Sequence, residues 1–361
     1  MSTNHDNVSL EGVHSQAIPF PKPVASKTSV QIGFIGLGNI GSLMAQNMAR
    51  KGPIGEPNFP AIMVWNRTPS KAEKLVAMVG KEKARIAQDL EQVAQECDVV
   101  VINLANDDVV RTVYLRIQAC LKQSPPTRNK IFVETSTIYP SLAAELDVMV
   151  SQCPLTRLIT CPVIGSPIVA EKSELILVMS GEYRSKQEVS HLLVPAVGRK
   201  VIDLGGDVQK SLTFKLIGNS MILGNIEVIA EALTFAEKSG IGGHHVEHLI
   251  REYLPAPSML SYTQKMRHAN FDGKNGFSID GGIKDATHIR RLTAHYNSPM
   301  PGIDVAHQNL LTARALHERH VKEGKTRWPT LDWSGIIAGT RVAAGLNGFD
   351  KTKDFGTLDE Q

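Results

Sequence analysis

The stretch GFIGLGNIGSLMAQNMARKG, residues 33–52, carries three glycines in the spacing G-x-G-x-x-G, at Gly36, Gly38 and Gly41. The residues just before the glycines, 30–35, are mostly apolar, which is typical of a buried parallel strand. After them, apolar residues recur at helical spacing. A strand, these glycines and then a helix form the arrangement that a dinucleotide-binding loop requires, because the second glycine lets the backbone approach a pyrophosphate. The alternative is a strand-to-helix turn whose glycines serve steric needs alone.

The loop and the end of the next strand predict a cofactor and its form. In the loop we expect contacts with a dinucleotide from five consecutive residues, Gly36, Leu37, Gly38, Asn39 and Ile40. The next strand, 61–65, ends in Asn66-Arg67-Thr68, where an NAD-specific site usually has a carboxylate for the ribose 2′-hydroxyl. Arg67 can instead bind a 2′-phosphate bidentately, with Asn66 and Thr68 as neutral donors. We therefore predict NADP(H); the alternative is that Arg67 is a surface residue at the start of a helix.

Strands and helices alternate through the first half of the chain. Strands are expected at 30–35, 61–65, 84–87, 97–104, 131–134, 158–160 and 174–180, with helical segments between most of them. This order predicts an α/β fold with a Rossmann-type doubly wound parallel sheet. In such a sheet ligands bind at the carboxyl ends of the strands. We therefore expect further cofactor contacts from the residues that follow two of these strands, Leu104, Ala105, Asn106, Ser136 and Thr137.

The second half of the chain shows helical patterns without strands. The longest, 208–239, is apolar nearly all round, which indicates a helix buried on several sides. We predict that this helix joins the sheet domain to an all-helical C-terminal domain. The predicted organisation is a flexible N-terminal tail at 1–29, an NADP-binding Rossmann domain at 30–205, a helical substrate and dimerisation domain at 206–347, and a C-terminal tail at 348–361.

Two polar residues on the long helix are candidates for chemistry. Lys215 and Asn219 stand four residues apart and therefore on one helical face. A lysine buried beside a cofactor is costly unless it has a partner or a catalytic role. Hydride transfer to a carbonyl leaves negative charge on oxygen, so a proton donor is needed, and burial can lower the pKa of a lysine toward neutrality. The alternative is that Lys215 extends to solvent and Asn219 has no special partner.

Composition and charge exclude other classes of partner. The 361 residues are 42% hydrophobic and carry a formal net charge of +3 without a long run of Lys or Arg, so no nucleic acid is expected as a partner. No apolar run was expected to be long enough for a membrane span, and we predict no membrane partner. The polar, arginine-free segment 1–28 fits neither a secretory signal nor a mitochondrial leader. Four cysteines without C-x-x-C spacing favour reduced thiols, and the predicted location is cytoplasmic.

The three histidines of GGHHVEHL raise the question of a metal. His244 and His248 have the i, i+4 spacing that is compatible with ligation. Because no acidic third ligand stands nearby, we predict a polar helix start and no metal. Cys161, which has no His or Asp assistant in its neighbourhood, is interpreted as a small packing residue.

Four blocks in order resemble the β-hydroxyacid dehydrogenase family: GFIGLGNIG with VWNRT, then ETSTIYP, TCPVIGSP and FKLIGNS. The resemblance implies hydride transfer between NADP(H) and a small-molecule carbonyl substrate, with Lys215 and Asn219 as catalytic residues that also bind the substrate. A later segment, FSIDGGIKDATHI, is similar to the family segment whose lysine lines the active site, here Lys284. The family also implies a homodimer or homotetramer.

The third block departs from the family pattern. Ile164-Gly165-Ser166 stands where the family has Ser-Gly-Gly, which binds the substrate carboxylate through a hydroxyl and backbone amides. Gly165 and Ser166 can still offer amides, but Ile164 replaces a hydroxyl by an apolar group. This favours a different, less polar substrate; the alternative is that Ile164 only packs against the cofactor.

Three functions follow. The first is an NADP(H)-dependent oxidoreductase acting on a small aldehyde or keto acid and its alcohol. The second is imine reduction, for which similar proteins usually carry Asp or Tyr in place of Lys215. The third is an NADP(H)-binding regulatory protein without activity.

Overall fold

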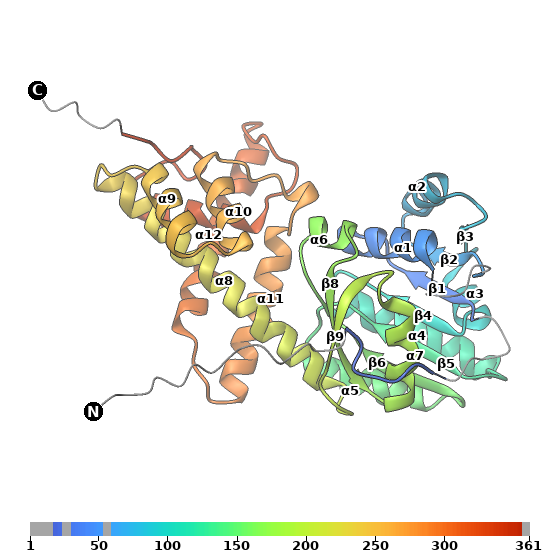
Figure 1. Ribbon diagram of the computed structural model, residues 1–361. Coiled ribbons are helices and arrows are strands. Elements are labelled where there is room, and N and C mark those ends of the chain that lie inside the picture. The colour runs from blue at the N-terminus through green and yellow to red at the C-terminus, as the bar shows by residue number, and fades with distance from the viewer. Residues whose placement is uncertain (1–16, 24–29, 53–58, 356–361) are drawn as a thin grey trace, which may run out of the picture.

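The computed structural model describes residues 17–23, 30–52 and 59–355, which form an α/β half and a helical half (Figure 1). Helix α8 (Gln209–Lys238) runs between the halves and packs on both of them. It contacts β8 and α5 on one side and the helices α9 to α13 on the other. The predicted fold class, a Rossmann-type doubly wound sheet followed by an all-helical domain on a long interdomain helix, is confirmed.

The sheet has the strand order β3-β2-β1-β4-β5-β6-β8-β7, with β9 paired to β8. The strands are β1 (Ile32–Ile35), β2 (Ile62–Trp65), β3 (Ala84–Ile86), β4 (Val99–Ile102), β5 (Lys130–Glu134), β6 (Thr156–Thr160), β7 (Val163–Ile164), β8 (Leu175–Gly181) and β9 (Gly198–Asp203). The predicted parallel pairing holds from β3 to β6. Beyond β6 the sheet is mixed, because β8 runs antiparallel to both β6 and β7. Only β7 and one short helix link β6 to β8, which is not the helical crossover that parallel pairing needs.

Helices cover both faces of the sheet. One face carries α1 (Asn39–Lys51), α2 (Pro69–Val79), α6 (Pro167–Glu171) and α7 (Tyr183–Leu193), and the other carries α3 (Leu90–Glu96), α4 (Asp107–Gln123) and α5 (Pro140–Ser151). Successive strand residues alternate between the two apolar clusters, so Phe34 lies in one and Ile35 in the other. Burial on both faces explains why these strands are continuously apolar in sequence.

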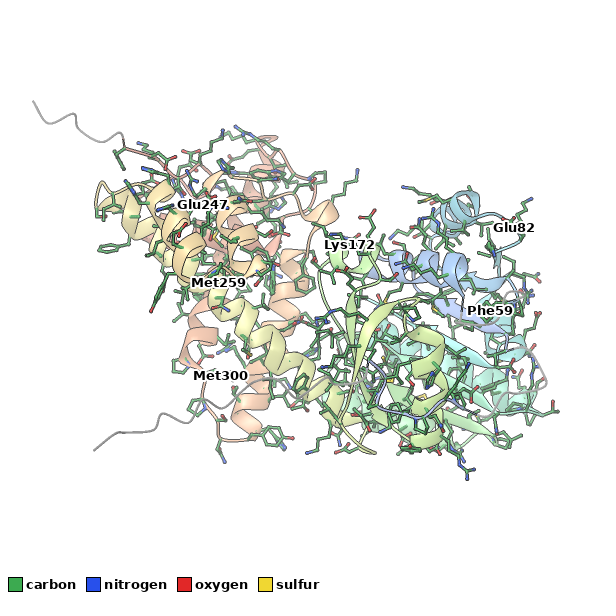
Figure 2. The ribbon with its side chains drawn as sticks, viewed as in Figure 1. Phe59, Glu82, Lys172, Glu247, Met259 and Met300 are labelled. Atoms are coloured by element: carbon green, nitrogen blue, oxygen red, sulfur yellow. The ribbon has the colours of Figure 1, made fainter. Side chains whose placement is uncertain are left out.

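The helical half surrounds the C-terminal part of α8. Its elements are α9 (Gly243–Tyr253), α10 (Pro257–Arg267), η1 (Gly273–Asn275), α11 (Ile279–His295), α12 (Pro301–Lys322), η2 (Trp333–Ile336) and α13 (Ile337–Ala343). All of them except η1 share a third apolar cluster with α8. Figure 2 shows Glu247 and Met259 within this half, and Lys172, just after α6, at the end of the α/β half that lies nearest to it.

Helix α8 corrects one expectation about membranes. Within the described ranges it is the one helix that is long and apolar enough to cross a membrane, judged by length and composition alone. The prediction that no apolar run reaches this length is therefore wrong. Part of the apolar surface of the helix packs against both halves, while Met221, Val228 and Phe235 are exposed.

Both predicted tails contain packed residues. Near the N-terminus, Val201 N–H donates to Ala17 O at 2.8 Å, and Phe20 is buried with its ring edge-on to Tyr183 at 5.5 Å. Near the C-terminus, Asp354 pairs with Arg267 at 2.8 Å. Single apolar and charged anchors therefore hold parts of 17–23 and 348–355, although neither segment has a periodic pattern. Residues 1–16, 24–29 and 356–361 lie outside the described part of the chain.

Candidate functional site

The glycine loop joins β1 to α1, and its glycines meet different spatial demands. Gly36 has φ +96°, and a Cβ there would lie 2.2 Å from the Asn103 carbonyl oxygen. A Cβ on Gly41 would lie 2.2 Å from the Gly36 carbonyl oxygen. In contrast, a Cβ on Gly38 would have no heavy atom within 4 Å. The first and third glycines are thus needed for packing, while the second opens onto free space.

This open space lies at the N-terminus of α1, where an anion is favoured. The first turn of α1 has no acidic residue and no side chain caps it, so its backbone N–H groups are available to a ligand. Together with the space beside Gly38, these groups fit the pyrophosphate of a dinucleotide. Leu37 and Ile40 belong to the same turn, with Leu37 buried and Ile40 half-buried.

Asn39 connects this turn to the helical half. Its Nδ2 donates to Lys274 O at 3.1 Å and to Gly276 O at 3.4 Å. The backbone around η1 therefore lies directly beside the N-terminus of α1, where the pyrophosphate would bind. The sequence pattern does not signal this contact, because the partners are 235 residues apart or more.

The end of β2 carries the residues predicted to read the ribose. Leu37 N–H donates to Asn66 Oδ1 at 2.9 Å, and Asn66 Nδ2 donates to Thr68 O at 3.0 Å. Asn66 therefore orders the glycine loop and its own turn rather than serving mainly as a donor to phosphate. Arg67 and Thr68 are exposed next to it. Arg67 is thus the side chain in this turn that can bind a 2′-phosphate.

The ends of β4 and β5 meet, as the sequence predicts. Leu104 N–H donates to Ser136 Oγ at 2.7 Å, which joins the two loops. Asn106 caps α4 by accepting from Val109 N–H at 3.0 Å, and Ala105 is exposed beside it. Thr137 follows Ser136, and its carbonyl oxygen accepts a hydrogen bond from Lys284 Nζ of α11. The predicted Leu104–Asn106 and Ser136–Thr137 segments therefore form one edge of the sheet, and α11 lies against it.

Lys215 and Asn219 lie on α8 close to this edge. Asn219 Nδ2 donates to Asp285 Oδ2 at 2.6 Å, and the other oxygen of Asp285 lies 3.2 Å from Lys284 Nζ. Lys215 is half-buried, and the charges of Asp285 and Lys284 both affect its pKa. Three of the predicted residues, Lys215, Asn219 and Lys284, are thus brought together by the packing of α8 on α11.

The amine of Lys215 is tuned by its surroundings. Burial lowers the pKa of Lys215 to about 8, the Asp285 carboxylate acts in the opposite direction, and the Lys284 ammonium lowers it further. The side chain of Lys215 is intermediate in exposure, and its amine is desolvated enough for burial to be the main cause of its lowered pKa. An amine of this pKa exists in both protonation states near neutral pH, which a proton donor and acceptor requires.

The third block lies next to the same stretch of α8. Ile164 ends β7, and its Cδ1 lies 3.8 Å from the position that a Cβ on Gly218 would take, between Lys215 and Asn219. Gly165 has φ +149°, and any side chain there would meet Leu175 at 2.6 Å. Ser166 is exposed at the start of α6, and its hydroxyl forms no cap bond. The structure therefore places an apolar group where the family carries a hydroxyl.

Sequence reasoning missed Asp285 and an interdomain pair. Asp285 is buried and links Asn219 to Lys284, and its only signal was its position after the lysine of the KD segment. On the same helix, His288 Nε2 lies 3.1 Å from Asp107 Oδ1 at the start of α4. No local pattern predicts a pair 181 residues apart.

The remaining candidates have structural roles. His244 lies at the start of α9, where it pairs with Asp354 at 3.1 Å and its ring lies 3.9 Å from that of His245. Within the described residues no group of three His, Cys, Asp or Glu side chains is arranged to hold a metal. Cys161 is buried like the other three cysteines, which are all free thiols. Trp333 Nε1 donates to Tyr262 Oη at 2.8 Å within the helical half.

Two family descriptions match consecutive parts of the chain. Residues 31–206 match the NAD binding domain of 6-phosphogluconate dehydrogenase. Residues 210–325 match the NAD-binding domain of NADP-dependent 3-hydroxyisobutyrate dehydrogenase. The division between the two matches falls at the start of α8.

Individual relatives are distant but cover most of the chain. The NADH-dependent oxidoreductase ucdB of Aspergillus ustus is 25% identical over 85% of this chain and 98% of its own length. The cytokine-like nuclear factor N-PAC of Xenopus tropicalis is 26% identical over 81% of this chain, which spans about half (51%) of that protein.

Solved structures share the fold. A Mycobacterium tuberculosis 3-hydroxyisobutyrate dehydrogenase with L-serine has a TM-score of 0.66 at 21% identity, covering 87% of this chain and 100% of its own. An imine reductase from Myxococcus stipitatus with NADP+ has a TM-score of 0.54 at 18% identity, covering 85% of this chain and 98% of its own.

Proposed function

This chain belongs to the β-hydroxyacid dehydrogenase family, and on that premise we propose that it is an NADP(H)-dependent oxidoreductase that interconverts a small aldehyde or keto acid and its alcohol. The observation that carries the proposal is the half-buried amine of Lys215, which lies beside Asn219 and near Asp285 and Lys284. A nicotinamide cofactor supplies the hydride when it is bound. The chain's own residues must therefore bind, orient and move a proton.

Lys215 is the proton donor and acceptor in this proposal. In reduction its ammonium gives a proton to the carbonyl oxygen as negative charge develops there, and in oxidation the neutral amine takes the hydroxyl proton. Asn219 donates one amide proton to Asp285, so its second amide proton is available to the substrate oxygen. Asp285 thus orients Asn219 while its charge favours the protonated form of Lys215.

The preference for the phosphorylated cofactor rests on Arg67. Its guanidinium is exposed beside the glycine loop, and the β2 end, Trp65-Asn66-Arg67, has no carboxylate that would repel a 2′-phosphate. The ucdB relative is described as NADH-dependent and the imine reductase structure holds NADP+, so the family includes both forms. We assign NADP(H) to this chain on the guanidinium.

Ile164 supports a substrate less polar than a simple hydroxy acid. Its methyl end lies over Gly218, one turn from Lys215, where a carboxylate would have to be held. Binding a substrate carboxylate against the apolar surface of Ile164, without hydrogen-bond donors, would have a large desolvation cost. An aldehyde or ketone with an apolar substituent fits this surface better than 3-hydroxyisobutyrate.

A second candidate is imine reduction. The fold is shared with the imine reductase structure, and the I-G-x-P block of this chain, Ile164-Gly165-Ser166-Pro167, resembles that of imine reductases. Lys215 favours carbonyl chemistry over this candidate. The third possibility is a binding protein without activity. The similarity to N-PAC, which is described as a nuclear factor, supports it. The presence of both Lys215 and Asn219 argues against it.

The subunit arrangement is also a proposal: we infer a homodimer through α8. Four apolar residues recur seven apart along it, Phe214, Met221, Val228 and Phe235, and the last three are 66%, 60% and 73% exposed. This spacing is that of a helix-pairing seam. The seam is self-complementary about the point between Gly224 and Asn225, since an antiparallel copy places Met221 against Val228 and Phe214 against Phe235. A Cβ on Gly224 would meet nothing within 4 Å, so a second helix can approach closely.

The dimer is tested by introducing charge into the seam. Met221→Glu with Val228→Glu should yield monomers in analytical ultracentrifugation, while Val148→Glu, at an exposed site on α5, should leave the mass unchanged. A double variant that stays dimeric refutes the seam.

One kinetic panel tests the function. NADPH oxidation is followed with semialdehydes, α-keto acids, apolar ketones and cyclic imines for the wild type and for Lys215→Ala. If the wild type reduces carbonyl compounds and Lys215→Ala does not, the proposal is supported. Turnover of imines that the variant retains supports imine reduction, and NADPH binding without turnover of any compound supports the binding protein.

A further inference from the structure

A continuous set of contacts connects Asn219 to the interior of the α/β half. Asn219 Nδ2 donates to Asp285, whose second oxygen lies 3.2 Å from Lys284 Nζ. Lys284 Nζ in turn donates to the carbonyl oxygen of Thr137, in the loop after β5. The position of Asn219 is therefore coupled to the conformation of the Thr135–Thr137 turn in the other half.

The side chain of Glu134, the last residue of β5, binds the backbone of that turn. Ser136 N–H donates to Glu134 Oε1 at 2.8 Å. The Ser136 hydroxyl oxygen accepts from Leu104 N–H at 2.7 Å, which fixes the neighbouring loop after β4. Glu134 thus anchors the edge at which Leu104 and Ser136 are expected to meet the nicotinamide end of the cofactor.

Half of the Glu134 carboxyl group is left unsatisfied. Glu134 is fully buried, and its Oε2 has no hydrogen-bond partner among the described residues. The hydroxyl of Tyr114, on α4, is buried and also without a partner there. Each group affects the other, because the Glu134 charge contributes to raising the pKa of Tyr114. Orphaned polar atoms are rare in protein interiors, so two neighbouring ones suggest a function.

The surroundings disfavour the charged form of Glu134. Burial raises the pKa of Glu134 to about 7, while its interactions with Ser136 and with the nearby Tyr114 hydroxyl act in the other direction and the Asp107 carboxylate raises it slightly. Asp107 itself is paired with His288 of α11.

We propose that Glu134 is a positioning residue whose ionisation tightens the Ser136–Thr137 turn and thereby sets the cofactor-facing edge and, through Lys284 and Asp285, the placement of Asn219. An ionised carboxylate accepts the Ser136 N–H more strongly than a neutral acid does. The proton leaves Oε2, and the Tyr114 hydroxyl is the nearby donor that can then turn toward it. This inference rests on the proposed function only for the part that concerns turnover.

The test uses Glu134→Gln, which keeps an acceptor for Ser136 N–H and cannot ionise. The matched control is Glu145→Gln, which removes an exposed carboxylate paired with Arg111 on the surface. NADPH affinity is measured by fluorescence titration at pH 6 and pH 8. Between pH 6 and pH 8, the NADPH affinity of the wild type and of the control should increase by a factor of about five more than the affinity of Glu134→Gln does.

Turnover supplies the second readout. For the best carbonyl substrate, the wild-type kcat should rise as pH passes through 7, and Glu134→Gln should lose this rise while keeping the fall that Lys215 causes at higher pH. Tyr114→Phe should keep the rise but move it to higher pH, since the ionised acid loses its donor. If Glu134→Gln shows the wild-type pH dependence in both measurements, the inference is overturned.

A third readout needs neither cofactor nor substrate. Because the pKa of Glu134 is raised in the folded state, its contribution to stability is present below the ordinary carboxyl pKa and is lost as pH rises through about 7. Thermal unfolding of the free protein should therefore show Glu134→Gln gaining in melting temperature relative to the wild type between pH 5 and pH 8. If Glu134→Gln does not fold, Tyr114→Phe provides the test, because removal of the nearby hydroxyl should move the pH-dependent loss of stability of the wild type to higher pH. If the melting temperatures differ with pH as expected but no compound is turned over, the proposed function alone is refuted. If the difference in melting temperature between Glu134→Gln and the wild type is the same at pH 5 and pH 8, the role of Glu134 is refuted.

Discussion

Replacement of Lys215 by alanine is the most direct perturbation of the proposed chemistry. A positioned general acid or base contributes about 10²- to 10⁴-fold to the rate, which corresponds to about 3 to 5 kcal/mol of activation free energy. Asn219 and Lys284 remain bound to Asp285 when the amine is removed, so binding of the substrate oxygen is largely kept. The loss should therefore appear in kcat, with KM changed by less than about threefold.

The pH dependence gives an independent signature of the same amine. Since the pKa of Lys215 is lowered to about 8 by burial, kcat/KM for carbonyl reduction should fall above pH 8. Oxidation of the alcohol should show the opposite dependence, because it needs the neutral amine. The folded state also binds this proton less tightly than the unfolded chain, so stability should rise with pH from about 8 toward 10.5, and Lys215→Met should lack that rise.

The assay follows NADPH absorbance at saturating cofactor over a pH range that brackets 8. Lys210→Ala is the matched control, since Lys210 is exposed on the same helix and should leave kcat within a factor of about two. A Lys215→Ala enzyme that keeps more than a tenth of the wild-type kcat, or a reduction profile without a fall above pH 8, would refute the assignment of Lys215 as the proton donor.

Three further outcomes follow from the geometry of the site. Arg67→Ala should raise KM for NADPH about 10- to 100-fold, the equivalent of a charge-assisted pair, and leave KM for NADH nearly unchanged; equal effects on both cofactors in steady-state kinetics would contradict the role of the guanidinium. Gly36→Ala should lower the free energy of unfolding by several kcal/mol in urea titrations because its Cβ would lie 2.2 Å from a carbonyl oxygen, whereas Gly38→Ala, with open space, should stay within about 1 kcal/mol and instead weaken NADPH binding. Ile164→Ser should raise kcat/KM for a hydroxy acid about tenfold relative to an uncharged alcohol, and an unchanged ratio would show that Ile164 does not face the substrate.

Several elements of the site could be predicted because their signals are local. Gly36, Gly38 and Gly41 stand within six residues; packing requires the first and the third, and the second leaves open space at the start of α1. Lys215 and Asn219 share one face of α8 because they are four residues apart on a regular helix. The meeting of the loops after β4 and β5 follows from parallel pairing of adjacent strands, which places their carboxyl ends at one edge.

Other elements could not be predicted, because their partners are distant in sequence. Asp285 meets Asn219 across 66 residues and Asn39 meets the η1 backbone across 235, and no periodicity encodes either contact. Beyond β6, strand β7 has only two residues and β9, which pairs parallel to β8, has no clear apolar pattern, so neither was expected. Phe20 anchors residues 17–23 by one buried ring, which a polar segment does not reveal.

The sequence by itself determined the nucleotide loop, the order of strands and helices, the long joining helix and the pair Lys215 and Asn219, since each depends on backbone geometry within one turn or on hydrophobic periodicity. Tertiary structure alone decided that Lys215 has a pKa of about 8, that Asp285 orients Asn219, and that Glu134 lies unsatisfied beneath the cofactor-facing edge. Desolvation and charge pairing depend on what surrounds a group in space, and those surroundings come from helices α8 and α11 and strand β5, which only folding brings together.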